Sequence, residues 1–256
     1  MGGKIEKIQE LHKLYTADAI TKSEFEILKK EIIEEINPLE ANKASDIQKP
    51  YIIQYGDGVS DVDGNAYKSV IIGSQEWLVE NLRTTKYADG THIPNVMDRE
   101  EWKNVNTGAY CHYDNDSQYD SVYGKLYNCH AVETGKLCPT GWHVPTDAEW
   151  TLLEDYLSAN GHSVKEGTAL KSTSGWDNIY GRSGNGTDYY GLNSLPGGSR
   201  ANNGSFYYTG SFGYWWSSSE LGASFAPVRY LDFSNDIVNS FNYGKKNGFS
   251  VRCLKD

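Results

Sequence analysis

The stretch "GWHVPTDAEWTLLEDYLSAN", residues 141–160, carries the most complete helix signal in the chain. Thr146 stands at the expected N-cap, and Glu149, three residues later, can return a hydrogen bond to the Thr146 amide. Beyond this capping box, Trp150, Leu153 and Leu157 recur at three- and four-residue spacing and would share one face. The pattern predicts an amphipathic helix packed against a core.

His143, just before this helix, is a candidate general base because imidazole titrates near neutral pH. No nucleophile and no metal-ligand partner stands at a recognisable spacing from it. We therefore interpret His143 as a structural residue of the turn that leads into the helix, and we expect no catalytic residue in the chain.

After Gly161 the helical spacing disappears. Turn-forming strings such as "SGNGT" (183–187) and "ANNGS" (201–205) alternate with β-rich stretches around residues 214–216, 228–233, 238–243 and 249–254. In "GYWWSSSE", residues 213–220, Trp215 and Trp216 are adjacent, so a strand would point them to opposite faces. We interpret both rings as scaffold, with one of them in the core.

The first 37 residues have a separate pattern. Two apolar stripes with helical spacing consist of Ile5, Ile8, Leu11, Leu14 and Tyr15, and of Phe25, Leu28, Ile32 and Ile36. Between them, Thr21 and Glu24 form a capping box, and Ile20 and Phe25 form a hydrophobic staple. This segment resembles the SHOCT module, which implies a helical hairpin over residues 1–37, followed by a polar linker at 38–57.

Two helices this short bury too little surface to be stable alone. We therefore expect a homo-oligomer that forms through the N-terminal helices. The formal net charge of −10 without a basic cluster argues against a nucleic-acid partner. No apolar run is long enough for membrane insertion, and the first residues lack a signal peptide. Surface display, secretion and phage association all stay open.

Asp61, Asp63 and Asn65 invite comparison with a calcium loop. An EF-hand loop needs Gly at position six and Glu at position twelve, where this chain has Ala66 and Ile72. Asp63-Gly64 is instead typical of a hairpin turn. The acidic string "DNDSQYD", residues 114–120, is interpreted as a solvated loop, and we predict no cofactor.

Six ordered strings extend over residues 58–256 and resemble the Fibrobacter succinogenes major paralogous domain. They are "DGNAYKSVIIGSQEWLVENLRTTKYADGTHIP" (63–94), "GKLYN" (124–128), "GKLCPTGWHVPTDAEW" (135–150), "LPGGSR" (195–200), "GYWWSSSE" (213–220) and "GFSVRCLKD" (248–256). The resemblance implies an α+β domain of the C-type-lectin-like fold, related to variable proteins of diversity-generating retroelements. That fold has a small twisted antiparallel sheet, two helices and long irregular loops, and its last strand returns near the beginning of the domain.

The four cysteines, Cys111, Cys129, Cys138 and Cys253, do not have the spacing of a zinc site. Their number allows two disulfides, and free thiols are equally consistent with the sequence. The resemblance places Cys138 before the helix and Cys253 on the last strand, where the two would be neighbours and able to form a disulfide. It gives no support for a bond between Cys111 and Cys129.

Residues 221–244, "LGASFAPVRYLDFSNDIVNSFNYG", contain no Lys, Glu, Gln, Met or Trp. These are the residue types that NNC and NNT codons cannot encode, as expected for retroelement diversification of adenines. Aromatic, amide and charged side chains of this region would form a binding surface. The predicted ligand-binding residues are Tyr207, Tyr208, Phe212, Phe225, Arg229, Tyr230, Asp232, Phe233, Asn235, Asp236, Asn239, Phe241 and Tyr243. The alternative is strand alternation, in which about half of the aromatic residues are buried.

The sequence thus favours a non-enzymatic protein that binds an unknown protein or glycan ligand. A carbohydrate-binding, lectin-like module of fixed specificity is the alternative, although no calcium-lectin tripeptide (Glu-Pro-Asn or Gln-Pro-Asp) is present. An oxidase like the formylglycine-generating enzymes is disfavoured, because only Cys253 follows Cys138 and thiol chemistry there lacks a second cysteine.

Overall fold

The structure, a computed structural model, describes residues 11, 13, 14, 21, 24, 25, 28 and 51–256. The chain divides into two units, residues 1–52 and 53–256. In the first unit, the Thr21 amide donates to Glu24 Oε2 over 2.8 Å and the Glu24 amide donates to Thr21 Oγ1 over 3.3 Å, which confirms the capping box. The staple residue Ile20, most of the predicted helical hairpin and residues 38–50 of the predicted linker lie outside the described residues.

The second unit contains short strands and a few short helices. The strands are β1 (Gln54–Tyr55), β2 (Val59–Ser60), β3 (Ala66–Tyr67), β4 (Ser69–Ile72), β5 (Gln75–Leu78), β6 (Tyr110–Cys111), β7 (Leu126–Tyr127), β8 (Trp142–His143), β9 (Asn178–Ile179), β10 (Arg182–Ser183), β11 (Gly197–Arg200), β12 (Phe206–Thr209), β13 (Phe212–Trp216), β14 (Phe225–Asp232), β15 (Asn239–Gly244) and β16 (Leu254–Lys255). The helices are α4 (Arg99–Asn104), α5 (Asp120–Tyr123), α6 (Cys129–Val132), α7 (Asp147–Leu157) and α8 (Glu166–Leu170), with short turns of 3₁₀ helix at Tyr113–Asn115 and Ser117–Tyr119 and of π-helix at Ser158–His162.

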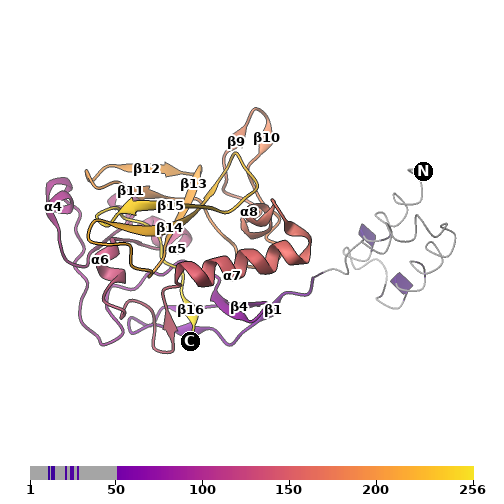
Figure 1. Cartoon of the computed structure of the whole chain (residues 1–256), viewed down its shortest axis with the longest axis horizontal. Coiled ribbons are helices and arrows are strands. Elements are labelled where there is room, and N and C mark those ends of the chain that lie inside the picture. The colour runs from indigo at the N-terminus through magenta and orange to yellow at the C-terminus, as the bar shows by residue number, and fades with distance from the viewer. Residues whose placement is uncertain (1–10, 12, 15–20, 22–23, 26–27, 29–50) are drawn as a thin grey trace. The chain divides into compact units, whose positions relative to one another are not determined.

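Two five-stranded sheets organise this unit. The first has the order β1-β4-β5-β16-β8 and is antiparallel, with Leu254 of the last strand opposite both Trp77 and His143. The chain therefore ends beside strands near the beginning of the domain, as predicted. The second sheet has the order β12-β11-β13-β14-β15, and within it only the β11–β13 pair is parallel. Figure 1 shows α7 running between β14 and β15 on one side and β4 and β1 on the other.

Helix α7 confirms the prediction made from residues 141–160. Thr146 and Glu149 form the capping box, with the Thr146 amide 2.8 Å from Glu149 Oε2, and Trp150, Leu153 and Leu157 are buried. The expectation that no helix follows Gly161 was wrong, because residues 166–170 form α8. Gly167 has a low intrinsic helix propensity. It lies so close to the main chain of Ile237 that a larger side chain would not fit.

Trp215 and Trp216 point to opposite faces of β13, and both are buried, at 3% and 0% exposure. Trp216 belongs to the main hydrophobic core, and its indole nitrogen donates to the Tyr127 carbonyl over 2.7 Å. Trp215 lies on the other face, with its ring 6.5 Å from that of Trp150 on α7. The interpretation of the pair as scaffold is thus consistent with their burial.

The Asp61–Asn65 segment forms a hairpin turn between β2 and β3, as predicted. Asp61 accepts hydrogen bonds from the amides of Asp63 and Asn65, over 3.0 and 2.9 Å, and its other oxygen accepts from the Tyr67 hydroxyl. Gly64, with φ +83°, occupies the left-handed position of the turn. The Asp61 carboxylate therefore holds the turn together.

Three buried cations hold the long loops in place. Arg200 donates to the carbonyls of Val96, Met97 and Asp98, and Arg252 donates to those of Leu78, Val79 and Leu192. The Lys171 ammonium donates to the carbonyls of Asp232 and Asn235, both over 2.6 Å. These contacts satisfy buried carbonyl groups that irregular backbone would otherwise leave without partners.

Cys138 and Cys253 form a disulfide, which confirms the pairing that the resemblance implied. Cys111 and Cys129 are free and buried, and burial raises the pKa of each thiol to about 12. The structure therefore resolves the alternatives that the sequence left open: one disulfide and two protonated thiols. At the level of fold class, the prediction of an α+β domain with small, mostly antiparallel sheets is confirmed.

Candidate functional site

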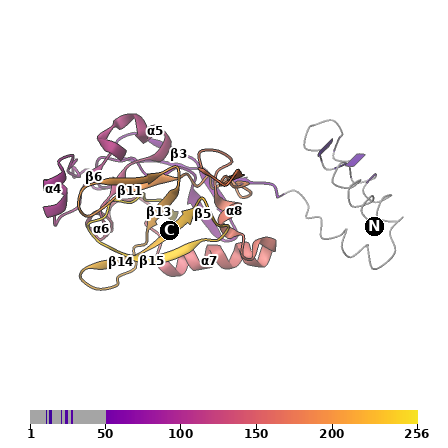
Figure 2. The ribbon, with the colours of Figure 1, turned by 90° about the horizontal axis from the view of Figure 1, so that it is seen from above.

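The second sheet gathers aromatic side chains because of its register. Tyr214 lies opposite Tyr230 on the neighbouring strand, and Phe212 lies two residues before Tyr214 on the same face. On β15, Tyr243 lies opposite Ala226, a small residue that leaves room for the ring. Cross-strand pairing thus places rings from β12, β13, β14 and β15 beside one another. Figure 2 shows β11, β13, β14 and β15 of this sheet from above.

These rings line a hollow of about 410 Å³, here called the aromatic groove. Its lining consists of Ser199, Ala201, Tyr207, Tyr208, Phe212, Tyr214, Tyr230, Tyr243, Asn247 and Phe249. The volume falls within the range of pockets that hold small molecules, about 300–1,000 Å³. Five of the predicted site residues therefore converge on one concavity: Tyr207, Tyr208, Phe212, Tyr230 and Tyr243.

The rings form a connected cluster. Phe212 is stacked on Tyr214 with centroids 5.6 Å apart and an interplanar angle of 12°, and Tyr214 is stacked on Phe249 at 4.9 Å. At the rim, Tyr208 lies 5.6 Å from Tyr207 and 5.2 Å from Phe212. Each ring restricts its neighbour, so the groove keeps its shape without a ligand.

Tyr208 has an unfavourable backbone conformation. Its φ is +71°, in the left-handed region that bulky residues rarely adopt, and 53% of the residue is exposed. The register of β12 on β11, with Tyr207 opposite Ser199, and the following turn at Gly210 hold it there. Tyr180 combines a positive φ of +48° with full exposure as well, so it is the place of Tyr208 in the groove lining, together with this strain, that makes Tyr208 a candidate site residue.

The groove is uncharged. Its lining residues, all in the described part of the chain, include no Asp, Glu, Lys, Arg or His. Burial and the neighbouring phenols raise the pKa of Tyr214, and burial raises that of Tyr243. Both hydroxyl groups therefore stay protonated and neutral at physiological pH.

Of the two further predicted aromatic residues, Phe241 on β15 lies beside the groove, whereas Phe225 stands four residues before Arg229 on β14 and therefore points to the other face of the sheet. Phe225 and Phe241 are 54% and 60% exposed, and the Phe241 ring is 5.2 Å from that of Tyr243. Phe241 lies opposite the buried Val228 in the register. The exposed aromatic area thus continues from the groove along β15.

The predicted polar residues at the β14–β15 connection form hydrogen bonds within the protein. Asp232 accepts from the Ser234 amide over 2.8 Å, and Asn235 accepts from the Ile237 amide and from the Asn239 side chain. Asp236 pairs with Arg182 at 3.0 Å and with Thr168 at 2.9 Å. Phe233, also predicted, lies 6.4 Å from Phe212. These four polar side chains shape the connection and do not line the groove.

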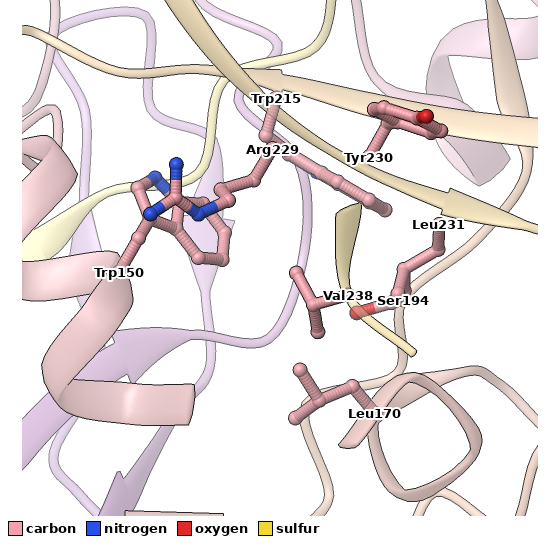
Figure 3. A pocket seen from close by; sticks show the side chains of 8 residues that line it. All are labelled: Trp150, Leu170, Ser194, Trp215, Arg229, Tyr230, Leu231 and Val238. Carbon is pink, nitrogen blue, oxygen red and sulfur yellow. The ribbon is translucent and has the colours of Figure 1, made fainter. Parts of the chain in front are cut away.

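Arg229, a predicted site residue, lies on the face of the sheet opposite the groove. Its side chain is 8% exposed, forms an ion pair with Asp147 and reaches Glu154 over 2.7 Å, both on or beside α7. Figure 3 shows Arg229 extending toward Trp150 on α7 while Tyr230 extends away from it. The structure therefore places Arg229 away from the groove that Tyr230 lines, because adjacent residues of a strand face opposite sides.

Figure 3 also shows a small hollow between this face of the sheet, α7 and α8. It measures about 10 Å³ and is lined by residues that include Trp150, Trp215 and Leu170. That volume is about the size of one water molecule. The space is too small for a ligand, so the groove is the better candidate.

The remaining polar clusters have structural partners. His143 is held between Asp256, 2.7 Å from Nδ1, and Glu149, 3.0 Å from Nε2, so it joins the chain end to α7. Asp120, in the acidic string 114–120, pairs with His112 and Lys125. Among the described residues, no group of three or more His, Cys, Asp or Glu side chains is placed to hold a metal ion.

Sequence reasoning missed half of the groove lining, namely Ser199, Ala201, Tyr214, Asn247 and Phe249. A signal was available for Tyr214, which alternates with Trp215 and shares a face with Phe212. Ser199 belongs to the string "LPGGSR", and Phe249 to "GFSVRCLKD". Their contact with the groove follows from strand order, which the sequence alone does not reveal.

The fold and the groove define an α+β domain with a preformed, uncharged aromatic concavity. The family model of the Fibrobacter succinogenes major domain matches residues 70–255. The chain belongs to this family. No curated protein and no solved structure matches the chain. No helix of the described residues is long and apolar enough to cross a membrane.

Proposed function

We propose that this protein binds a ligand non-covalently in the aromatic groove and has no enzymatic activity. The observation that carries the proposal is the convergence of Tyr207, Tyr208, Phe212, Tyr230 and Tyr243 on one hollow of about 410 Å³. Rigid aromatic side chains give large contact area at a low entropic cost. The strained, exposed Tyr208 is consistent with a residue kept for binding at the expense of stability.

The composition of the groove also supports binding over catalysis. A serine or tyrosine hydroxyl is a weak nucleophile unless an adjacent general base, most often an imidazole, carboxylate or amine, activates it. The described groove lining has none of these groups. For an oxidase of the formylglycine-generating type, two reactive thiols are required, whereas Cys253 is bonded to Cys138 and the other two thiols are buried.

The test uses the full chain on a glycan array and on a phage-displayed random peptide library. We expect a ligand whose binding is lost in Tyr230→Ala and Tyr208→Ala and kept in Tyr180→Ala. Tyr180 is a matched control because it is a fully exposed tyrosine at the β9–β10 turn, outside the groove lining. Binding that all three variants retain, or turnover of a thiol peptide with added copper, would overturn the proposal.

A more specific proposal is that a diversity-generating retroelement varies the exposed residues of this binding surface. Residues 221–244, which lack the five residue types that NNC and NNT codons cannot encode, include the exposed Phe225 and Phe241 and the groove residue Tyr230. Sequencing of the gene across its source population should then show substitutions at adenine-derived codons for exposed positions. Trp215 and Arg229, both buried, should stay constant. Evenly scattered, mostly silent changes would indicate a fixed specificity instead.

We also propose that residues 58–256 have the C-type-lectin-like topology. Its support is the return of β16 to the first sheet, between β5 and β8, together with a second small sheet and long loops. A crystal structure, superposed on lectin-like domains, tests it.

Homo-oligomerisation through the SHOCT-like segment is proposed from the first unit. Leu14 and Leu28 are 45% and 39% exposed, whereas Leu11 and Phe25 are buried. Exposed leucines on short helices favour burial against a second copy. Light scattering of the full chain should therefore show a lower mass for Leu14→Glu with Leu28→Glu than for the control Lys13→Glu. Equal masses would contradict the oligomer.

A further inference from the structure

The chemical character of the aromatic groove narrows the class of ligand. Its polar atoms are hydroxyl and amide groups, from Ser199, Tyr207, Tyr208, Tyr230 and Asn247 among others, and its described lining has no charged side chain. An anionic ligand would lose its hydration in this hollow and gain no opposite charge. A cation could lie against the ring faces, but an ammonium group only donates hydrogen bonds and would leave the hydroxyl protons of the lining without acceptors. The groove therefore suits an uncharged molecule that both donates and accepts.

Hydroxyl groups are available inside the groove. No hydrogen bond between described residues uses the hydroxyl of Tyr207, Tyr208 or Tyr230, whereas those of Tyr214 and Tyr243 interact with each other. A phenol hydroxyl both donates and accepts. A purely apolar ligand would displace water from these groups and leave them unpaired, which costs free energy. The best ligand thus carries hydroxyl groups of its own.

The rim supplies flat apolar surface. Tyr207 and Tyr208 are 43% and 53% exposed, and their ring centroids lie 5.6 Å apart at an angle of 37°. Because the left-handed backbone of Tyr208 is held by the sheet and by the Gly210 turn, its ring is presented in a restricted orientation. A ligand with flat C–H faces can lie on such a ring while its polar edge faces the hydroxyl groups.

A pyranose ring combines these properties: it has C–H faces, hydroxyl groups at its edge that donate and accept, and no charge. We propose that the aromatic groove binds an uncharged saccharide, with one sugar ring stacked on Tyr208 at the rim and hydroxyl groups bonded to Tyr230 and Ser199 inside. The inference rests on the proposed function and names the ligand class for the same site. Asn247 contributes shape, because its amide already bonds the Gly244 carbonyl over 2.8 Å and the Asn202 amide over 3.2 Å.

The experiment uses the full chain on an array of neutral, sialylated and sulfated glycans, with a ten-residue polyproline peptide as a separate probe. We expect binding to neutral glycans only, a loss of at least tenfold in Tyr208→Ala, and a smaller loss in Tyr230→Phe, which keeps the ring and removes one hydroxyl. Tyr180→Ala should bind like the unaltered chain. Near-ultraviolet circular dichroism confirms that each variant is folded.

The outcomes separate the ligand class from the proposed function. Polyproline binding that depends on Tyr208, or binding only to sialylated or sulfated glycans, would overturn the proposal of an uncharged saccharide ligand. Either result would still support the proposal that the groove binds a ligand. Loss of glycan binding in EDTA would also overturn it, because the groove lining offers no carboxylate to a cation. If folded chain binds neither glycan nor peptide in a groove-dependent way, both proposals fail.

Discussion

The indole nitrogen of Trp215 donates a hydrogen bond of 2.8 Å to the amide oxygen of Asn81. Arg252 donates to the same oxygen from Nε and Nη2, over 3.2 and 2.7 Å. The Asn81 amide nitrogen in turn donates to the Tyr123 carbonyl over 2.8 Å. One buried asparagine thus joins the second sheet, the last residues of the chain and the end of α5. Its burial makes each of these bonds expensive to lose.

Replacement of Arg252 by Met should therefore lower the free energy of unfolding by about 3–5 kcal/mol, because several carbonyls and Asn81 would lose their donor in the interior. The matched control is Arg182→Met, which removes an ion pair whose Arg side chain is 66% exposed and should cost under about 1 kcal/mol. Urea denaturation of both variants measures the difference. Equal losses would show that Arg252 contributes little.

The cysteines should react in three distinct stages. Native protein at pH 8 should take up no iodoacetamide, because Cys111 and Cys129 are buried and protonated and the other two are bonded. Unfolding without a reductant should label those two thiols, and unfolding with dithiothreitol should label four. Mass spectrometry counts the adducts. Four adducts without a reductant would contradict the Cys138–Cys253 bond.

The chain should lose stability in acid through Asp63. Burial opposes ionisation of this carboxyl, but hydrogen bonds from the Thr85 amide and hydroxyl and the charge of Lys86 outweigh it and lower its pKa to about 2, from an ordinary value of 3.8. A depressed folded-state pKa stabilises above the unfolded value, and this contribution disappears as the pH falls from about 4 through about 2.

Asp63→Asn should therefore cost on the order of 1–2 kcal/mol at pH 7 and progressively less as the pH falls below 4. Guanidinium denaturation at several pH values checks this. Asp57→Asn, outside this cluster, serves as the control. A pH-independent difference between the parent and Asp63→Asn would contradict the assignment.

Local signals carried most of what could be predicted. The capping box of α7 lies within four residues, the Asp63-Gly64 turn lies within one hairpin, and the opposite orientation of Trp215 and Trp216 follows from strand geometry alone. The same alternation would have removed Arg229 from the predicted surface, had it been applied to the neighbouring Tyr230.

The hydrogen bonds from Arg200 and Arg252 to carbonyl groups of distant loops could not be predicted in this way. Arg200 bonds Val96, 104 residues away, and Arg252 bonds Leu78, 174 residues away, so nothing near either residue indicates its partner. Helix α8 was missed because its five residues are too few for a helical pattern and include Gly167, which lies where a side chain would collide with the main chain of Ile237. The groove depends on the order β12-β11-β13-β14-β15, in which the chain neighbours β12 and β13 are separated by β11.

The positive φ of Tyr208 should reverse the usual order of stability of its Gly and Ala variants. At most positions Gly is less stable than Ala, by about 0.5–1 kcal/mol, because it loses more backbone entropy on folding. At Tyr208 the φ of +71° strains every residue with a side chain, so Tyr208→Gly should be more stable than Tyr208→Ala by about 1 kcal/mol. Urea denaturation of the two variants gives the difference directly.

The neighbouring Tyr207 provides the control, because it is not among the residues with positive φ and it shares the same strand and a similar exposure. There the order should reverse, with Tyr207→Ala more stable than Tyr207→Gly. Because both substitutions at each position remove the ring, lost ring contacts cancel within each pair and only the backbone term differs. If Ala is more stable than Gly at Tyr208 as well, the backbone of Tyr208 carries no strain, and the restricted orientation of its ring at the rim of the groove loses its support.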